Sequence, residues 1–118
     1  MHYMLLIIGN QDAEPLPEGG PGLMEQFMAY HQSALEAGIV VGSNVLDSFE
    51  SATSVQVTRD GDRIVTDGPF AETREYLGGY YIVDVPDLDA AIDWAARCPG
   101  SQVGRIEIRP IQAIPRPG

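Results

Sequence analysis

The sequence has little cysteine and little positive charge. Its single cysteine, Cys98, cannot form an internal disulfide, so nothing in the chain requires an oxidising compartment. Lys and Arg number 7 against 17 Asp and Glu, which gives a formal net charge of −10 at pH 7. Because a surface of that charge repels polyanions, we exclude nucleic acid and anionic membranes as partners.

Long apolar runs are absent as well. The run MLLII (residues 4–8) is too short for a secretory signal, has no basic segment before it, and is followed by Asn10 and Gln11. No segment approaches the ~20 apolar residues of a membrane span, so we expect a cytoplasmic protein. The 118 residues, 44% of them hydrophobic, predict one domain over residues 1–118.

Signatures of metal and nucleotide sites are missing too. The histidines and the cysteine have no C-x-x-C or H-x-x-x-H spacing, so the sequence predicts no metal site. There is no G-x-S-x-G, Walker or G-x-G-x-x-G pattern, and the prolines near Gly19 and Gly20 argue against a phosphate cradle. We therefore expect no cofactor.

Strand-like and helix-like segments follow one another along the chain. Periodicity and turn residues predict strands at 2–8, 39–46, 78–85 and 104–111, helices at 23–37 and 88–98, and a hairpin at 53–65 that turns at Asp60-Gly61. We expect Pro21 in the first helical turn, Gly38 as its closing residue, Asp87 as the second helix's N-cap and a bulge at Gly42. The order predicts an α+β fold, a ferredoxin-like sandwich with an inserted β-hairpin and both helices on one sheet face.

The sheet face turned away from the helices is predicted to be apolar. If Tyr81, Val83 and Val85 point to the helices, then Tyr80, Ile82 and Asp84 point away, and one alternating set of the first strand does the same. Such a face is too apolar for water, so we infer a homodimer that pairs sheet against sheet. Met24, Met28 and Leu35 widen the apolar arc of the first helix and need cover from the preceding loop or a second subunit.

The stretch DGPFAETREYLGG (residues 67–79) joins the hairpin to the third strand of the main sheet. With the YMLLI start and the run LGGYYIVDVPDLDAAIDWAARCP, it closely resembles the DGPF family of YCII-related proteins along essentially the whole chain. The resemblance implies a dimeric α/β barrel of bacterial origin. It also implies relatives near or fused to extracytoplasmic-function sigma factors, and a wider group that includes a dehydrochlorinase.

A histidine and an aspartate are thought to act as a pair in a cleft of typical YCII proteins. The histidine precedes the glycine that closes the first helix by about three turns, and this chain has Phe27 in that region. His31 lies roughly one turn too late. No residue of this chain is therefore assigned to the pair.

Candidate ligand-binding residues cluster in and after the stretch 67–79, which we call the connector: Asp67, Phe70, Glu72, Arg74, Tyr80 and Asp84. Asp67 and Phe70 suit a structural corner as well as a site, and Arg74 suits either an anionic ligand or an ion pair. A buried Asp84 paired with an arginine could fix the register of the dimer. The candidate catalytic bases are Asp67 and His31, although a histidine at the core edge is also a common structural feature.

Three functions remain open at this point. The first is binding of a small polar or aromatic molecule in an inter-subunit cleft. The second is a regulatory protein-interaction module that acts with a sigma factor. The third is a cofactor-independent acid/base lyase or isomerase, with Arg74 as anion clamp and Tyr80 as hydrogen-bond donor. Whether the protein is an enzyme is left open.

Overall fold

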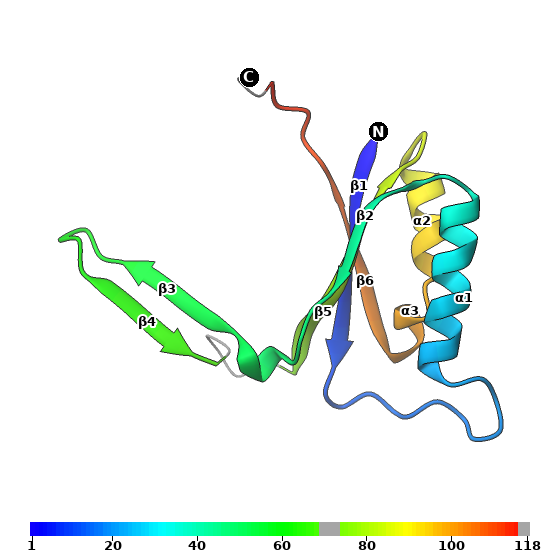
Figure 1. Cartoon of the computed structure of the whole chain (residues 1–118), viewed down its shortest axis with the longest axis horizontal. Coiled ribbons are helices and arrows are strands. Elements are labelled where there is room, and N and C mark those ends of the chain that lie inside the picture. Colours follow the sequence, from blue (N-terminus) through cyan, green and yellow to red (C-terminus); the bar gives the residue numbers. More distant parts are fainter. Residues whose placement is uncertain (69–73, 116–118) are drawn as a thin grey trace.

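A computed structural model describes residues 1–68 and 74–115 of the chain. It consists of one antiparallel sheet with helices packed on one face, and a hairpin that projects from the other side (Figure 1). The two parts meet near the end of the sheet where strand β5 (Glu75–Asp84) begins.

The main sheet has four strands: β1 (His2–Asn10), β2 (Val40–Val45), β5 (Glu75–Asp84) and β6 (Gly104–Pro110). Their order is β2-β5-β1-β6, and every neighbouring pair is antiparallel. Two split βαβ units produce this order, so the predicted ferredoxin-like α+β fold is confirmed. The bulge expected at Gly42 is also present, as a register shift between Val40 and Gly42.

The helices α1 (Leu23–Glu36) and α2 (Leu88–Arg97) lie side by side on one face of this sheet (Figure 1). Gly38 has φ of 70° just after α1, and the Asp87 carboxylate accepts a hydrogen bond from the Ala90 amide, so both predicted caps are confirmed. The expectation for Pro21 was wrong, because Gly22 is the N-cap and the helix begins one residue later. A further short helix, α3 (Gly100–Val103), was not predicted.

The core lies between the helices and the sheet. Its buried residues are Tyr3, Leu5, Tyr30, Tyr81, Val83, Val85, Ala91, Ala95 and Cys98, and Ala34 of α1 is also buried. The expectation that 81, 83 and 85 face the helices is thereby confirmed. Small alanines on α2 allow the helix to approach the strands closely, which explains why the bulky core side chains come mostly from the sheet.

One edge of α1 has no cover in the described part of the chain. Met24 is 74% exposed, Met28 66% and Leu35 49%. The loop before the helix, which we had considered as one cover, does not bury them. We call these three residues the methionine edge.

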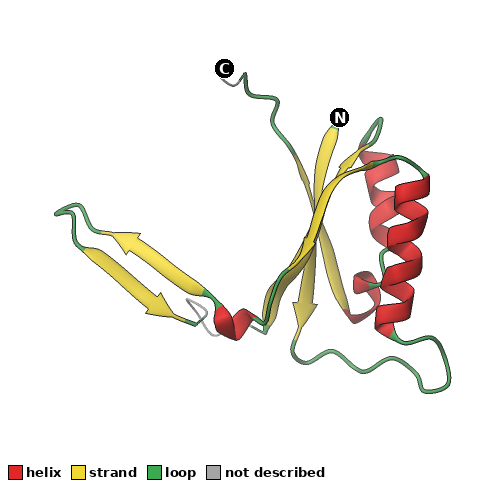
Figure 2. Ribbon diagram, in the orientation of Figure 1, coloured by secondary structure: helices red, strands yellow, loops and turns green. Residues whose placement is uncertain are grey.

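The projecting hairpin consists of β3 (Thr53–Val57) and β4 (Arg63–Asp67), which form a separate two-stranded sheet (Figure 2). Its turn lies at the predicted place, with the Gly61 amide bonded to the Thr58 carbonyl at 2.9 Å. All ten strand residues except Ser54 are exposed. We call residues 53–67 the arm. A short 3-10 helix, η1 (Phe49–Ser51), precedes it.

The side of the main sheet opposite the helices is the second uncovered surface. Strand alternation and register place Met4, Leu6 and Ile8 of β1 there, beside Tyr80 and Ile82 of β5. All five are partly exposed. We call this surface the open face, and its apolar character agrees with the sequence-based expectation.

Two details of the connector differ from expectation. Strand β5 begins at Glu75, before the predicted residue 78, and a register irregularity lies between Ile7 and Ile8, opposite Gly78. Gly68, at the end of the arm, has a φ of 86°, in the left-handed region that favours glycine. Among the described residues, no helix has the length and hydropathy needed to cross a membrane.

Candidate functional site

The structure disperses the predicted site residues over the molecule. Asp67 ends β4 at the base of the arm and is exposed. Tyr80 lies on the open face, where its hydroxyl accepts a hydrogen bond from the Asn44 amide at 2.8 Å. Asp84 lies at the far end of the same strand, 3.2 Å from the Met1 ammonium. Phe70 and Glu72 lie outside the described residues.

Arg74 is the predicted residue whose surroundings change its interpretation most. Its guanidinium lies 3.2 Å from an Asp12 carboxylate oxygen, and its carbonyl accepts a 2.8 Å hydrogen bond from the Gln11 amide. Both contacts go to the loop between β1 and α1. Because the pair is exposed, its free-energy contribution is small, but it fixes where this loop leaves the sheet.

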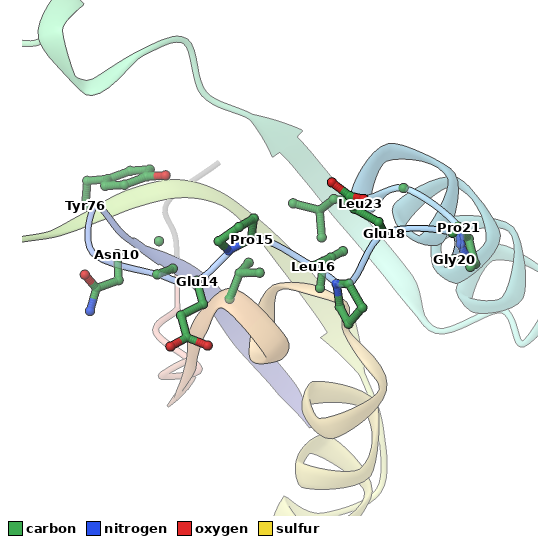
Figure 3. A pocket seen from close by; sticks show the side chains of 15 residues that line it. Asn10, Glu14, Pro15, Leu16, Glu18, Gly20, Pro21, Leu23 and Tyr76 are labelled. Atoms are coloured by element: carbon green, nitrogen blue, oxygen red, sulfur yellow. The ribbon is translucent and has the colours of Figure 1, made fainter.

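That loop covers a cavity of about 490 Å³. The lining comes from the loop itself, from Tyr76 of β5 and from the end of α3: Gly9, Asn10, Ala13, Glu14, Pro15, Leu16, Pro17, Glu18, Gly19, Gly20, Pro21, Gly22, Leu23, Tyr76 and Val103. Figure 3 shows Pro15 and Leu16 between Tyr76 at one end and Gly20 with Pro21 at the other. We call it the loop cavity.

The ends of the loop cavity are held by specific contacts. At one end Tyr76 packs on Phe49 with ring centroids 5.0 Å apart. At the other end the Gln26 side-chain amide donates to the Pro21 carbonyl at 3.0 Å. Most of the lining is apolar, and the charged groups among its described residues, Glu14 and Glu18, are both acidic. The arrangement suits a small ligand that has an apolar or aromatic body and carries a hydrogen-bond donor or an amine.

Charged side chains border the open face along β6. Arg105 binds both carboxylate oxygens of Glu75, at 2.7 Å and 3.3 Å, and also contacts Glu107 at 3.2 Å. Its hydrogen bond lowers the pKa of Glu75 below the ordinary value, and the two glutamates raise the pKa of Arg105. Arg109 lies 3.9 Å from Glu107. This border holds two guanidiniums and two carboxylates, so its formal charge is zero.

His31, a candidate base, lies on the helix side of the sheet. Its Nδ1 is 2.8 Å from the Tyr81 hydroxyl, and the Tyr81 ring packs edge-on against Tyr30 with centroids 5.5 Å apart. Burial raises the pKa of both tyrosines. Tyr80 points to the opposite face because adjacent strand residues alternate. The structure therefore does not bring His31, Asp67 and Tyr80 together.

No group of three or more His, Cys, Asp or Glu side chains arranged to hold a metal ion occurs within residues 1–68 and 74–115. In the same ranges, no buried side-chain nitrogen or oxygen lacks a hydrogen-bond partner. The core polar groups are thus satisfied within the chain, and the chemistry available to a ligand lies at its surface and in the loop cavity.

Comparison with known proteins decides the family. The model of the YCII-related domain matches residues 1–115. The chain belongs to the YCII-related family. It is also 45% identical to "Uncharacterized protein R00369" of Rhizobium meliloti (strain 1021), in an alignment that covers 81% of this chain and 77% of that protein. Membership of the DGPF subgroup stays a prediction.

Two features of this YCII-related chain escaped the sequence reading. The loop cavity was missed because we interpreted the proline- and glycine-rich segment 9–22 only as a connection. The His31–Tyr81 contact joins residues 50 positions apart, and helical periodicity placed His31 at the core edge without naming its partner. The alternation of β5, which places Tyr81 on the helix side, was the available signal for the second.

Proposed function

We propose that this YCII-related protein binds a small molecule with an apolar or aromatic body and a cationic or hydrogen-bond-donating group, in the loop cavity. The observation that carries the proposal is the cavity itself. Its volume of about 490 Å³ falls within the range of small-molecule sites, roughly 300–1,000 Å³. Its apolar floor supports burial of a ring, and its acidic rim favours a positive over a negative ligand.

The chemical preference follows from the rim. Glu14 and Glu18 are exposed carboxylates on the loop, and none of the described residues that line the cavity is a Lys or Arg. The net charge of −10 adds a negative field at longer range. An anionic ligand therefore meets repulsion at both distances, whereas an amine gains from both.

A pair of matched probes tests this proposal. We expect 2-phenylethylamine to shift the backbone amide NMR signals of residues 9–23 and Tyr76, and to bind at least about tenfold more tightly than phenylacetate. The variant E14Q/E18Q is expected to lose most of that preference. D89N/D93N removes the same charge from the outer surface of α2 and serves as its control. Equal binding of the two probes, or shifts confined to other regions, would contradict the proposal.

We further propose that the open face pairs with the open face of a second copy. The apolar centre formed by Met4, Leu6 and Ile82 supports this, together with the neutral charge of the β6 border. Two copies at −10 each repel one another in general, and the balanced charges of the β6 border add nothing to that repulsion. A ligand site between the two faces, beside Tyr80 and Asn44, belongs to the same proposal.

A second candidate function is a regulatory module that binds another protein, such as a sigma factor. The observation that favours it is the outer surface of α2, where Asp89 and Asp93 are both exposed. Salt-sensitive capture of a purified sigma factor, abolished by the reversal D89K/D93K, would support it. Capture that ignores both salt and the reversal would count against it.

A further inference from the structure

Tyr76 of β5 lies on the helix side of the main sheet, although simple alternation would place it on the open face. Counting back in steps of two from Tyr80, which lies on the open face, leads to Gly78 and then to Tyr76. The register skips Gly78, however, and pairs Ile8 with Leu77. Because Ile8 lies on the open face, its partner Leu77 lies there too, and the Tyr76 side chain turns to the opposite side. The bulge thus directs this ring to the side where the loop cavity lies.

Two glycines leave the space that the Tyr76 ring occupies. Gly9 is the register partner of Tyr76, and a Cβ atom at Gly9 would collide with three atoms of the ring. A Cβ atom at Gly78 would lie 3.9 Å from the same ring. The ring therefore leans across the backbone of Gly9, and a larger residue at that position would displace it.

Phe49 of η1 supports the ring from outside the loop cavity. The ring centroids of Phe49 and Tyr76 are 5.0 Å apart, with 31° between the ring planes. Tyr76 belongs to the cavity lining, whereas Phe49 is not among the described residues of that lining. Figure 3 shows Tyr76 at one end of the cavity. It is the single aromatic residue among the described residues that line the cavity.

We infer that Tyr76 determines the specificity of the loop cavity by stacking on the aromatic ring of an arylalkylamine ligand. The inference rests on the proposed binding of a small molecule in this cavity, and it names the ligand class: arylalkylamines in preference to alkylamines. An aromatic pair is more favourable than the area it buries would indicate. Since Gly9 and Phe49 already hold the Tyr76 ring, binding a ligand costs little further conformational freedom of that side chain.

The selection of the ligand's ring is separate from the selection of its charge. The acidic groups of the lining, Glu14 and Glu18, belong to the loop, whereas Tyr76 belongs to β5. Substitutions of the glutamates therefore change the preference for an amine over a carboxylate. Substitutions of Tyr76 change the preference for an aromatic over a saturated body.

The test compares 2-phenylethylamine with 2-cyclohexylethylamine, which carries the same amine on a saturated ring of the same size. Isothermal titration calorimetry of the full-length chain is expected to show at least about threefold tighter binding of the aromatic amine. Y76L should abolish this difference, and Y76F, which keeps the ring, should retain it. G9A, which displaces the ring without changing it, should reduce the difference. In NMR spectra the ring protons of Tyr76 should move upfield with the aromatic amine and not with the saturated one.

Equal binding of the two amines by the wild type, or equal weakening of both in Y76L, would overturn the inference. A retained preference for 2-phenylethylamine over phenylacetate would then leave the proposed function in place. Failure of both amines to bind the wild type would remove the proposed function, and the inference with it. If far-UV circular dichroism shows that Y76L does not fold, G9A decides, and an unchanged preference in G9A would overturn the inference.

Discussion

The hydroxyl of Tyr81 lies 2.8 Å from Nδ1 of His31, and this contact joins the middle of α1 to the central strand β5. Tyr81 is 7% exposed, so its hydroxyl is largely removed from water. A buried hydroxyl requires a partner, and the histidine supplies it. The finding explains why a polar ring is retained at the edge of an otherwise apolar helix surface.

Removing the histidine should destabilise the protein more than removing the hydroxyl. H31A leaves the buried Tyr81 hydroxyl without its partner and is expected to lower the free energy of unfolding by about 1–3 kcal/mol, and Y81F by only about 0.5–1.5 kcal/mol. Urea unfolding followed by the fluorescence of Trp94 measures both. Y80F, which removes an exposed hydroxyl next door, is the control. A cost for Y80F equal to that of H31A would contradict this account.

Where β6 begins to pair with β1, opposite Gly9, there is no room for a side chain at Gly104. A Cβ atom there would collide with the backbone carbonyl of Ile8, which cannot swing aside as a side chain can. We expect G104A to lower the free energy of unfolding by about 2–3 kcal/mol, in the range found for overpacked cores. G20A, where a Cβ atom would meet nothing within 4 Å, should change it little. Thermal unfolding by circular dichroism compares the two.

Stability should decline in alkali because of Cys98. The thiol is 1% exposed, and burial raises its pKa in the folded state. The unfolded chain loses this proton above about pH 8.5 while the folded chain keeps it, so the free energy of unfolding falls as pH rises above that value. C98A should lack this decline. The raised pKa values of Tyr30 and Tyr81 predict a further decline above about pH 10, which C98A should retain.

The pKa of Glu75 should report directly on Arg105. The 2.7 Å hydrogen bond from Arg105 lowers the pKa of the carboxyl group below its ordinary value. In R105Q the pKa should rise toward that value, since the neutral amide no longer favours the ionised form. Carboxyl carbon NMR titration measures it. R109Q, whose closest carboxylate belongs to Glu107, should leave Glu75 unchanged.

Elements with strong local signals were predictable from the sequence. Periodicity predicted both long helices to within one residue at each end. Their boundaries carry local signals, because Gly38 adopts a positive φ after α1 and the Asp87 side chain caps the first turn of α2. The short helix α3 was missed because Pro99 and Gly100 normally end a helix, whereas here they start a new turn. Local propensity does not contain the tertiary contacts of this turn, where a Cβ atom at Gly100 would lie 2.8 Å from Ile7 and 3.4 Å from Phe27.

The candidate site was less predictable, for a geometric reason. Asp67, Arg74, Tyr80 and Asp84 lie within 18 positions of one another in the sequence, yet they lie in different parts of the fold. Asp67 is at the base of the arm and Arg74 contacts the loop, whereas Tyr80 is on the open face and Asp84 at the far end of β5. Strand alternation and the departure of the arm from the sheet separate them. The loop cavity depends instead on the path of the segment 9–22 between β1 and α1. The Arg74–Asp12 pair ties this segment to the start of β5, and it joins residues 62 positions apart.

The order of the strands has a consequence for how the protein is made. β1 is synthesised before the other strands, but its two hydrogen-bonded neighbours are β5 and β6, which are synthesised last. During translation β1 therefore has no strand partner until β5 emerges, and its second edge waits for β6. The four-stranded sheet cannot be completed until β6 has left the ribosome.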